Sequence, residues 1–329
     1  MSKASYQVLL PLLKLKSHLS DVEEFHGKVN VVFHDIESLY YDQIHKEMWE
    51  SLPQQFARIL DSDLLKALEK KQNLTMLDIG CGTGLASDLM LKNKIGQSID
   101  SICLLDTSPL MLQRAKKRAE KWHREATFEC GDLDTINQKF DIIITCSVLH
   151  HIPDLKHFME EIEGKLNPNG IFISMHDPLE EAISSKIYED RTQTYTLFYQ
   201  KNRKRNLVQR AYAKAIRLLK KFNKKIDYLE EVNQELLSSK VIHTPLNAGE
   251  IWSITDIHVE DLPYSNKKGV SIKELEQFAP QLELKKLLTY SFFGTLKSNL
   301  LPQYQLKEVE LLTKNDPNGR NFGSLWTKR

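Results

Sequence analysis

The pattern of apolar and polar positions changes along the chain, and residues 73–178 alternate between two patterns. Short apolar runs there are typical of buried strands, and apolar positions at three- and four-residue intervals are typical of helices. We predict strands at 76–79, 101–106, 126–130 and from residue 140, and helices near 85–94, 109–122 and 155–166. Strands that alternate with helices imply right-handed crossovers and a parallel sheet, so this region predicts an α/β fold.

The flanking segments have other patterns. Residues 1–72 show helical spacing and predict an N-terminal helical cap. Residues 179–269 form a long insertion with helical spacing from Val208 to Leu229, and residues 270–329 predict a helix and two closing strands. The predicted regions are therefore a cap (1–72), an α/β core (73–178), an insertion or lid (179–269) and strands that complete the core sheet (270–329).

Three glycines at alternate positions, Gly80, Gly82 and Gly84, follow the first predicted strand. Glycine has no Cβ and adopts positive φ at little cost, so a ligand can lie close to such a backbone. A dinucleotide fingerprint would place its third glycine at position 85, which is Leu85 here. Pyrophosphate binding is therefore disfavoured. Asp106 closes the second strand, where a carboxylate accepts hydrogen bonds from ribose hydroxyls.

Taken in this order, the motifs resemble those of the class I S-adenosylmethionine (SAM) dependent methyltransferases. The resemblance is good over residues 33–178 and looser over the last sixty residues. It implies a Rossmann-like seven-stranded sheet with helices on both faces, one antiparallel strand near the end, an N-terminal helical cap and a large helical insertion after strand five. It also implies S-adenosyl-L-methionine as the cofactor.

The resemblance assigns the cofactor contacts. In the family, the glycine loop holds the methionine portion of SAM, the acid at Asp106 binds the ribose, and Asp132 with Leu133 matches the adenine contacts. The segment 33–42 resembles one that folds over SAM in many small-molecule methyltransferases, although an ordinary packed helix explains it equally well. The candidate cofactor-binding residues are Asp78, Gly80, Cys81, Gly82, Gly84, Asp106, Thr107, Asp132, Leu133 and Ser147.

Methyl transfer from a sulfonium is an in-line displacement, so a base is needed only where the acceptor is a hydroxyl. His150 and His151 follow the fourth strand, and His150 matches the catalytic histidine of plant phenolic O-methyltransferases, to which this stretch is similar. His176 and Asp177 close the fifth strand at the same rim of the sheet. These four residues are the candidate catalytic groups, and a structural hydrogen bond is the alternative role of each histidine.

Composition narrows the class of partner. The chain has 45 basic and 44 acidic residues and a net charge of +1, so no overall field favours nucleic acid. Cys81, Cys103, Cys130 and Cys146 show no paired spacing, which favours free thiols in a reducing compartment. We expect a cytoplasmic protein without a signal peptide or membrane span, and the oligomeric state stays open.

Within the insertion, residues 186–226 carry thirteen Lys or Arg and two acids. A solvated helix face is the simplest interpretation, and binding of an anionic acceptor, a lipid headgroup or RNA are the others. No His, Cys or acid cluster has metal-ligand spacing, so no metal is expected, although distant residues can assemble a site.

Three functions compete. The leading one is methyl transfer to a small-molecule or lipid-like acceptor. The second is methylation of RNA or protein that docks on a basic helix at 201–225, and the third is a noncatalytic SAM-binding protein.

Overall fold

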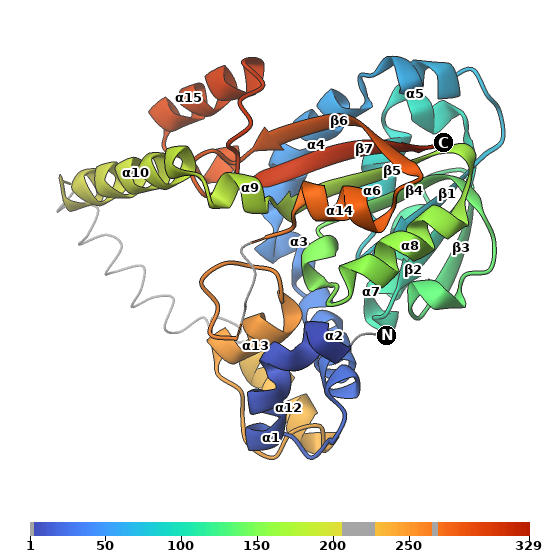
Figure 1. Ribbon diagram of the computed structural model, residues 1–329. Helices are drawn as coiled ribbons and strands as arrows, with labels where there is room; N and C mark the ends of the chain where they lie inside the picture. Colours follow the sequence, from blue (N-terminus) through green and yellow to red (C-terminus); the bar gives the residue numbers. More distant parts are fainter. Residues whose placement is uncertain (1–2, 206–227, 265–268) are drawn as a thin grey trace.

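The computed structural model describes residues 3–205, 228–264 and 269–329, and its centre is a seven-stranded sheet (Figure 1). The strand order is β3-β2-β1-β4-β5-β7-β6. All neighbouring strands from β3 to β5 pair in parallel, whereas β7 is antiparallel to both β5 and β6. The strands are β1 (Leu74–Ile79), β2 (Ile99–Asp106), β3 (Glu125–Cys130), β4 (Phe140–Cys146), β5 (Leu166–Pro178), β6 (Leu282–Tyr290) and β7 (Asn321–Lys328). This arrangement confirms the predicted class I methyltransferase fold.

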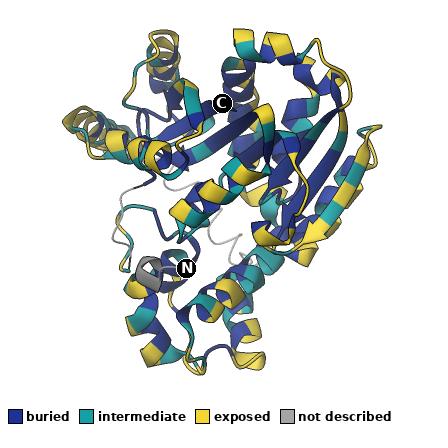
Figure 2. Cartoon of the chain, turned by 45° about the vertical axis from the view of Figure 1, so that its right-hand side comes forward, coloured by how far each residue is buried: buried dark blue, intermediate teal, exposed yellow. Residues whose placement is uncertain are grey.

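Alternate residues of each strand point to opposite faces of the sheet, and both faces are apolar. Helices therefore cover both faces. Met76, Ile102 and Ile144 pack on one face with α4 (Lys46–Leu60), α5 (Asp63–Leu68), α6 (Leu85–Leu91), α7 (Pro109–Ala119) and α15 (Pro302–Thr313). Leu77 and Phe172 pack on the other face with α8 (Leu155–Lys165) and α14 (Ile272–Phe278). Figure 2 shows the central strands buried and the outer sides of the helices exposed, whereas the edge strand β3 is exposed or half-buried along its length.

A third apolar cluster forms a cap below the carboxyl ends of the parallel strands (Figure 1). The amino-terminal segment supplies a 3₁₀ helix (Lys3–Leu9), α1 (Leu10–Lys16) and α2 (Val22–Ser38), and the insertion supplies α12 (Tyr228–Ser238) and α13 (Ala248–Thr255). Phe33 lies at their junction, with ring centroids 5.2 Å from Trp252 and 5.9 Å from Tyr228. The cap is therefore built from two distant parts of the sequence.

Side chains cap the amino-terminal ends of two of the cap helices, α2 and α13. The Asp21 carboxylate accepts hydrogen bonds from the backbone N–H groups of Glu23 and Glu24 and so caps α2. Asn247 and Glu250 form a reciprocal capping box at the start of α13. Glu250 also pairs with Lys16 at 2.5 Å, so one carboxylate both starts α13 and joins it to α1.

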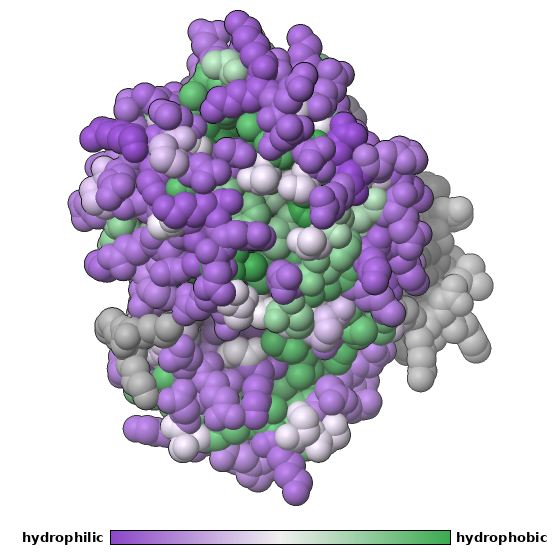
Figure 3. Space-filling model, turned by 90° about the vertical axis from the view of Figure 1, so that its right-hand side faces the viewer, coloured by the Kyte–Doolittle hydropathy of each residue, from purple (hydrophilic) through white to green (hydrophobic). Residues whose placement is uncertain are grey.

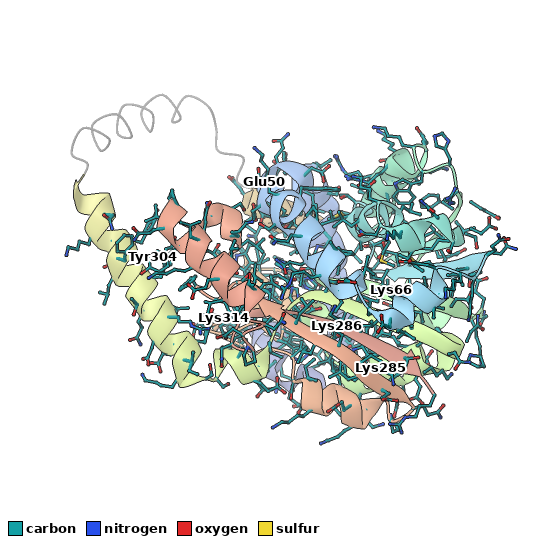
Figure 4. All side chains as sticks on the ribbon, turned by 90° about the horizontal axis from the view of Figure 1, so that it is seen from above. Glu50, Lys66, Lys285, Lys286, Tyr304 and Lys314 are labelled. Atoms are coloured by element: carbon teal, nitrogen blue, oxygen red, sulfur yellow. The ribbon has the colours of Figure 1, made fainter. Side chains whose placement is uncertain are left out.

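The two edge strands of the sheet are β3 and β6, and β6 carries Lys285 and Lys286 (Figure 4). Lysines on an edge strand discourage pairing with another chain. The Lys286 ammonium donates hydrogen bonds to the backbone carbonyls of Arg58 (2.5 Å) and Asp61 (2.6 Å), and so holds the end of α4 against this edge.

The core helices α6, α7 and α8 lie where the spacing predicts them. Helix α15 was not predicted; its Tyr304 packs on Tyr195 of α10 (Lys186–Arg205), with ring centroids 4.7 Å apart (Figure 4). The predicted helix through Val208 and Leu219, and most of the basic segment 201–225, fall outside the described residues. The remaining short helices are α3 (Tyr41–Ile44), α9 (Glu180–Ile183) and the 3₁₀ turns Lys94–Gln97, Leu133–Thr135, Leu149–His151 and Lys297–Asn299.

No described helix has both the length and the apolar character needed to cross a bilayer. Apolar side chains gather in the middle of one face of the molecule, within a hydrophilic surround (Figure 3).

Candidate active site

A cavity of about 670 Å³ lies between the cap and the carboxyl ends of the parallel strands. The sheet order changes direction between β1 and β4, and ligands of open α/β sheets bind at such a switch point. Residues that follow β1, β2 and β4 form one wall, and residues of α2 and α13 and of the turns after them form the opposite wall. The volume falls in the ~300–1,000 Å³ range of small-molecule sites.

The glycine loop after β1 lies in the core wall. Gly80, Gly82 and Gly84 all have positive φ, of 59°, 52° and 85°. A Cβ at Gly80 would lie 2.6 Å from Cγ2 of Val148, so the loop packs tightly against the segment after β4. At Gly82 a Cβ would meet no atom within 4 Å, which leaves space for a ligand directly above the backbone.

Two carboxylates hold the loop in place. Asp106 accepts hydrogen bonds from the N–H groups of Gly82 and Ser108, both at 2.8 Å, and its burial raises the pKa of its carboxyl group. Asp78 accepts hydrogen bonds from the N–H group (3.1 Å) and the hydroxyl (2.6 Å) of Ser87, and its burial raises its pKa to about 7. Its second oxygen, Oδ1, is buried with no partner among the described residues.

The ten candidate cofactor residues divide into two groups. Those in the cavity wall are Gly80, Gly82, Asp106, Thr107, Asp132, Leu133 and Ser147. Asp78, Cys81 and Gly84 lie behind the loop: Asp78 contacts Ser87, the Cys81 N–H group donates to the Leu105 carbonyl, and Gly84 precedes α6. The structure thus brings the first group together around one space, and the second group supports it.

His150 lies between two carboxylates. Its Nδ1 is 2.8 Å from Oδ1 of Asp177, and its Nε2 is 3.4 Å from Oδ1 of Asp256. Burial lowers the pKa of His150, but the hydrogen bonds and charges of Asp177 and Asp256 outweigh burial and raise it to about 9. Without a ligand at this place the imidazole is protonated at neutral pH, so it is not a free base there.

His151 and His176 are neutral. The Nδ1–H group of His151 donates to the Thr255 carbonyl at 2.6 Å, which leaves the lone pair on Nε2. Burial, together with the charge of His150, lowers the pKa of His151 to about 3. Burial also lowers the pKa of His176 to about 3; its Nδ1 lies 3.2 Å from the Tyr290 hydroxyl and its φ is +68°. Both side chains line the cavity.

The cap wall contains titratable groups that were not among the predicted site residues. Glu37 contacts Nδ1 of His34 at 3.3 Å and Nε2 of His45 at 3.0 Å. Burial raises the pKa of Glu37, but these hydrogen bonds and charges outweigh it and lower the pKa to about 2. The signal for Glu37 was the segment 33–42, whereas nothing in the local sequence distinguishes Asp256.

The charge of the cavity wall differs from that of the basic segment in the insertion. Its titratable side chains are those of histidine, aspartate, glutamate, tyrosine and cysteine, and no lysine or arginine is among the described residues that line it. The described part of the wall therefore offers no permanent cation for an anionic acceptor.

Comparisons with known proteins agree with this geometry. Residues 70–231 match the model of a family described as "Methyltransferase domain". A ubiquinone biosynthesis O-methyltransferase of Rhodopseudomonas palustris is 31% identical over 110 residues, which are 33% of this chain and 42% of the relative. The enzyme of the same name from Coxiella burnetii is 30% identical over 112 residues, 32% of this chain and 46% of the relative.

The chain thus spans less than half of the length of these curated relatives. Among solved structures, the cyclopropane synthase MmaA2 of Mycobacterium tuberculosis covers 82% of this chain and 88% of its own, at 12% identity and a TM-score of 0.41. Likeness at that level adds no argument about function.

Proposed function

We propose that the protein is a SAM-dependent methyltransferase, because residues 70–231 match the model of a methyltransferase domain, and that it transfers a methyl group from SAM to a hydroxyl oxygen of a small acceptor. The observation that carries the proposal is the single cavity with the glycine loop and Asp106 in one wall and the cap in the other. Cofactor and acceptor would meet there, shielded from water by α2 and α13.

The residues present fit the cofactor. The open space above Gly82 admits a ligand against the backbone. Gly80 and Gly82 would hold the methionine portion, Asp106 the ribose hydroxyls, and Asp132 with Leu133 the adenine. SAM supplies a methyl group made electrophilic by its sulfonium charge. The acidic groups around the cavity favour that positive charge.

The acceptor is proposed to be a small neutral molecule with a hydroxyl group, of the phenol or catechol class. Both named relatives are O-methyltransferases of ubiquinone biosynthesis. The described wall carries no lysine or arginine, which disfavours an anionic acceptor, and Trp252 and Tyr41 offer aromatic surface. The insertion is proposed as an acceptor-binding region because it contributes Trp252 and Asp256.

The neutral imidazole of His176 is the proposed proton acceptor within the cavity. His150 is not proposed as the base, because its two carboxylate partners hold its ring in place and favour its protonated form. The proposed catalytic groups thus remain at the ends of β4 and β5, as predicted, but His150 is no longer the proposed base.

The experiment is a label transfer. Purified protein is incubated with methyl-deuterated SAM and a panel of catechols and phenols, and in parallel with small-molecule, lipid, RNA and protein fractions of a cell extract. We expect a gain of three deuterium atoms in a hydroxylated small molecule or lipid, together with S-adenosylhomocysteine.

Label in RNA or protein would overturn the acceptor class and favour docking through residues 201–225. SAM binding by calorimetry without label in any fraction would favour the noncatalytic alternative. Absence of SAM binding to the folded protein would overturn the proposal altogether.

A further inference from the structure

We propose that His150, His151 and Asp256 bind a divalent transition-metal ion in the cavity wall, and that this ion activates the hydroxyl of the acceptor. The binding site stands on its own geometry, whereas the activating role rests on the proposed function. The three side chains offer ligand atoms that all lie within 4.8 Å of one another.

The ligand set is of a kind that metals prefer. Two imidazoles and one carboxylate are typical of catalytic Zn²⁺ sites and of non-haem Fe²⁺ sites, which keep further positions open for a substrate. Nε2 of His150 and Oδ1 of Asp256 are 3.4 Å apart. Two ligands at about 2.0–2.1 Å from a tetrahedral ion are themselves about 3.3–3.4 Å apart, so this pair is already spaced for an ion between them.

Each of the three ligands is also oriented from behind. Nδ1 of His150 is 2.8 Å from Asp177, Nδ1 of His151 donates to the Thr255 carbonyl, and Oδ2 of Asp256 accepts from the Thr255 hydroxyl at 2.7 Å. Carboxylates and backbone carbonyls behind histidine ligands fix the ring and raise its basicity in metal sites. These contacts occupy one polar atom of each ligand and leave the other for a metal.

An ion pair between His150 and Asp256 does not account for the whole arrangement. Charge-assisted N–H···O bonds are about 2.7–2.9 Å long, which is shorter than the 3.4 Å observed here. An ion pair between His150 and Asp256 also does not explain why the His151 ring lies next to them, with its centroid 4.0 Å from that of His150. A metal ion would use all three side chains.

Asp134, His157 and Glu161 form a second cluster with suitable ligand atoms, and it makes a useful contrast. The side chains of Asp134 and His157 are 51% and 37% exposed, so this cluster is solvated. Solvated acidic groups of this kind occur without metals, and His157 therefore serves as the matched control.

The proposed reaction is a proton transfer followed by an in-line displacement. The hydroxyl oxygen of the acceptor would coordinate the ion, which would lower the pKa of the hydroxyl, and the proton would pass to the imidazole of His176. The oxygen then bonds to the methyl carbon while the carbon–sulfur bond breaks and its electron pair stays on sulfur. No oxidant or reductant is needed.

The test measures metal binding directly. Chelator-treated protein is titrated with Co²⁺, monitored by visible absorption and metal analysis. We expect one ion per chain, with affinity reduced at least 10-fold in His151→Ala and Asp256→Asn and unchanged in His157→Ala. Asp177→Asn, which leaves all three ligands in place, is expected to lose 10–100-fold in affinity. Circular dichroism establishes that each variant is folded.

The site would be overturned if wild-type protein bound no Co²⁺, or if folded His151→Ala and Asp256→Asn bound it as tightly as wild type. SAM affinity and label transfer are measured separately on the metal-free protein. Full methyl transfer without metal would remove the activating role and leave the proposed function intact. Loss of SAM binding would overturn the proposed function but not the metal site.

Discussion

The two walls of the cavity are encoded in different ways. The core wall comes from short motifs at the ends of adjacent parallel strands, where Gly80, Asp106 and Ser147 are brought together by the sheet itself. The cap wall comes from α2 and α13, where Phe33 meets Trp252 only because two distant segments share an apolar cluster. One wall depends on local sequence and strand order, and the other on long-range packing.

In the proposed function, this difference would separate cofactor binding from acceptor recognition. The glycine loop packs on the sheet and on Val148, and its contact with the amino-terminal segment is a hydrogen bond from the Thr83 hydroxyl to Asp42 at 3.3 Å. By contrast, His34 and Glu37 lie on the cap, and Asp256 directly follows cap helix α13. Substitutions in the cap are therefore expected to disturb the acceptor wall and spare SAM binding, and substitutions in the loop to do the reverse.

The largest effect is expected from Phe33→Ala. Phe33 is 1% exposed in the cap cluster, and truncation of a buried phenylalanine costs about 3–5 kcal/mol. Hydrogen exchange should rise in α2, α12 and α13 but not in β1 and β4. Leu15→Ala is the control, because Leu15 is 64% exposed and its loss should change stability by less than about 0.5 kcal/mol. Equal loss of protection throughout the sheet would contradict a separate cap.

Asp106→Ala tests the core wall. The carboxylate orders Gly82 and would accept hydrogen bonds from the ribose, so its loss should weaken SAM binding by about 1.5–3 kcal/mol, or roughly 10- to 150-fold. Asp100→Ala, on the exposed opposite end of β2, should leave the dissociation constant unchanged. Calorimetry makes the comparison, and equal affinities for both variants would exclude the role of Asp106.

Gly82→Ala tests two properties of position 82: its positive φ and the open space next to its backbone. The φ of 52° should cost about 1–2 kcal/mol of folding stability, because an L-residue is strained there. No steric clash adds to this cost, since the position is open. Urea denaturation measures the stability and calorimetry the SAM affinity. A loss of stability with unchanged SAM affinity would show that the open space is not the cofactor site.

The smallest effect is expected from Glu37→Gln and depends on pH. The pKa of Glu37 is lowered to about 2 in the folded protein, so its carboxylate stabilises the fold above its unfolded pKa near 4.5. That contribution is lost as pH falls through 4.5 towards 2. The variant should be about 1 kcal/mol less stable than wild type at pH 7, and the difference should shrink at pH 3. A pH-independent difference in urea denaturation would contradict the ion-pair role.

The difference between the core wall and the cap wall also explains which parts of the site could be predicted from the sequence. The sheet, the glycine loop and the acids at the strand ends follow from period and spacing within residues 73–178, because parallel strands bring their carboxyl ends to one rim. The sequence does not distinguish Asp132 from Asp78, because both are acids at the end of a strand. Only the structure shows that Asp132 is exposed and that Asp78 is buried.

The cap wall was less predictable for a physical reason. Asp256 follows α13 without any motif, and its distance from His150 depends on how α13 packs against α2. The lowered pKa values of His151 and His176 depend on burial, which the residue type alone does not give. The pKa of His150 is raised instead, because Asp177 of β5 and Asp256 after α13 both contact its ring. That convergence of two elements cannot be predicted from the local sequence.

The ion pair between Lys16 and Glu250 joins residues that are 234 positions apart. Ribosomes add about 5–20 residues per second, so helices α1 and α2 wait roughly 10–50 s for α13 to be synthesised. During that time the apolar side of α2, which includes Phe25, Val29 and Phe33, lacks its native partners from α12 and α13. The nascent chain therefore exposes part of its apolar amino-terminal segment through most of its synthesis, and transiently exposed apolar surface of this kind is prone to aggregation.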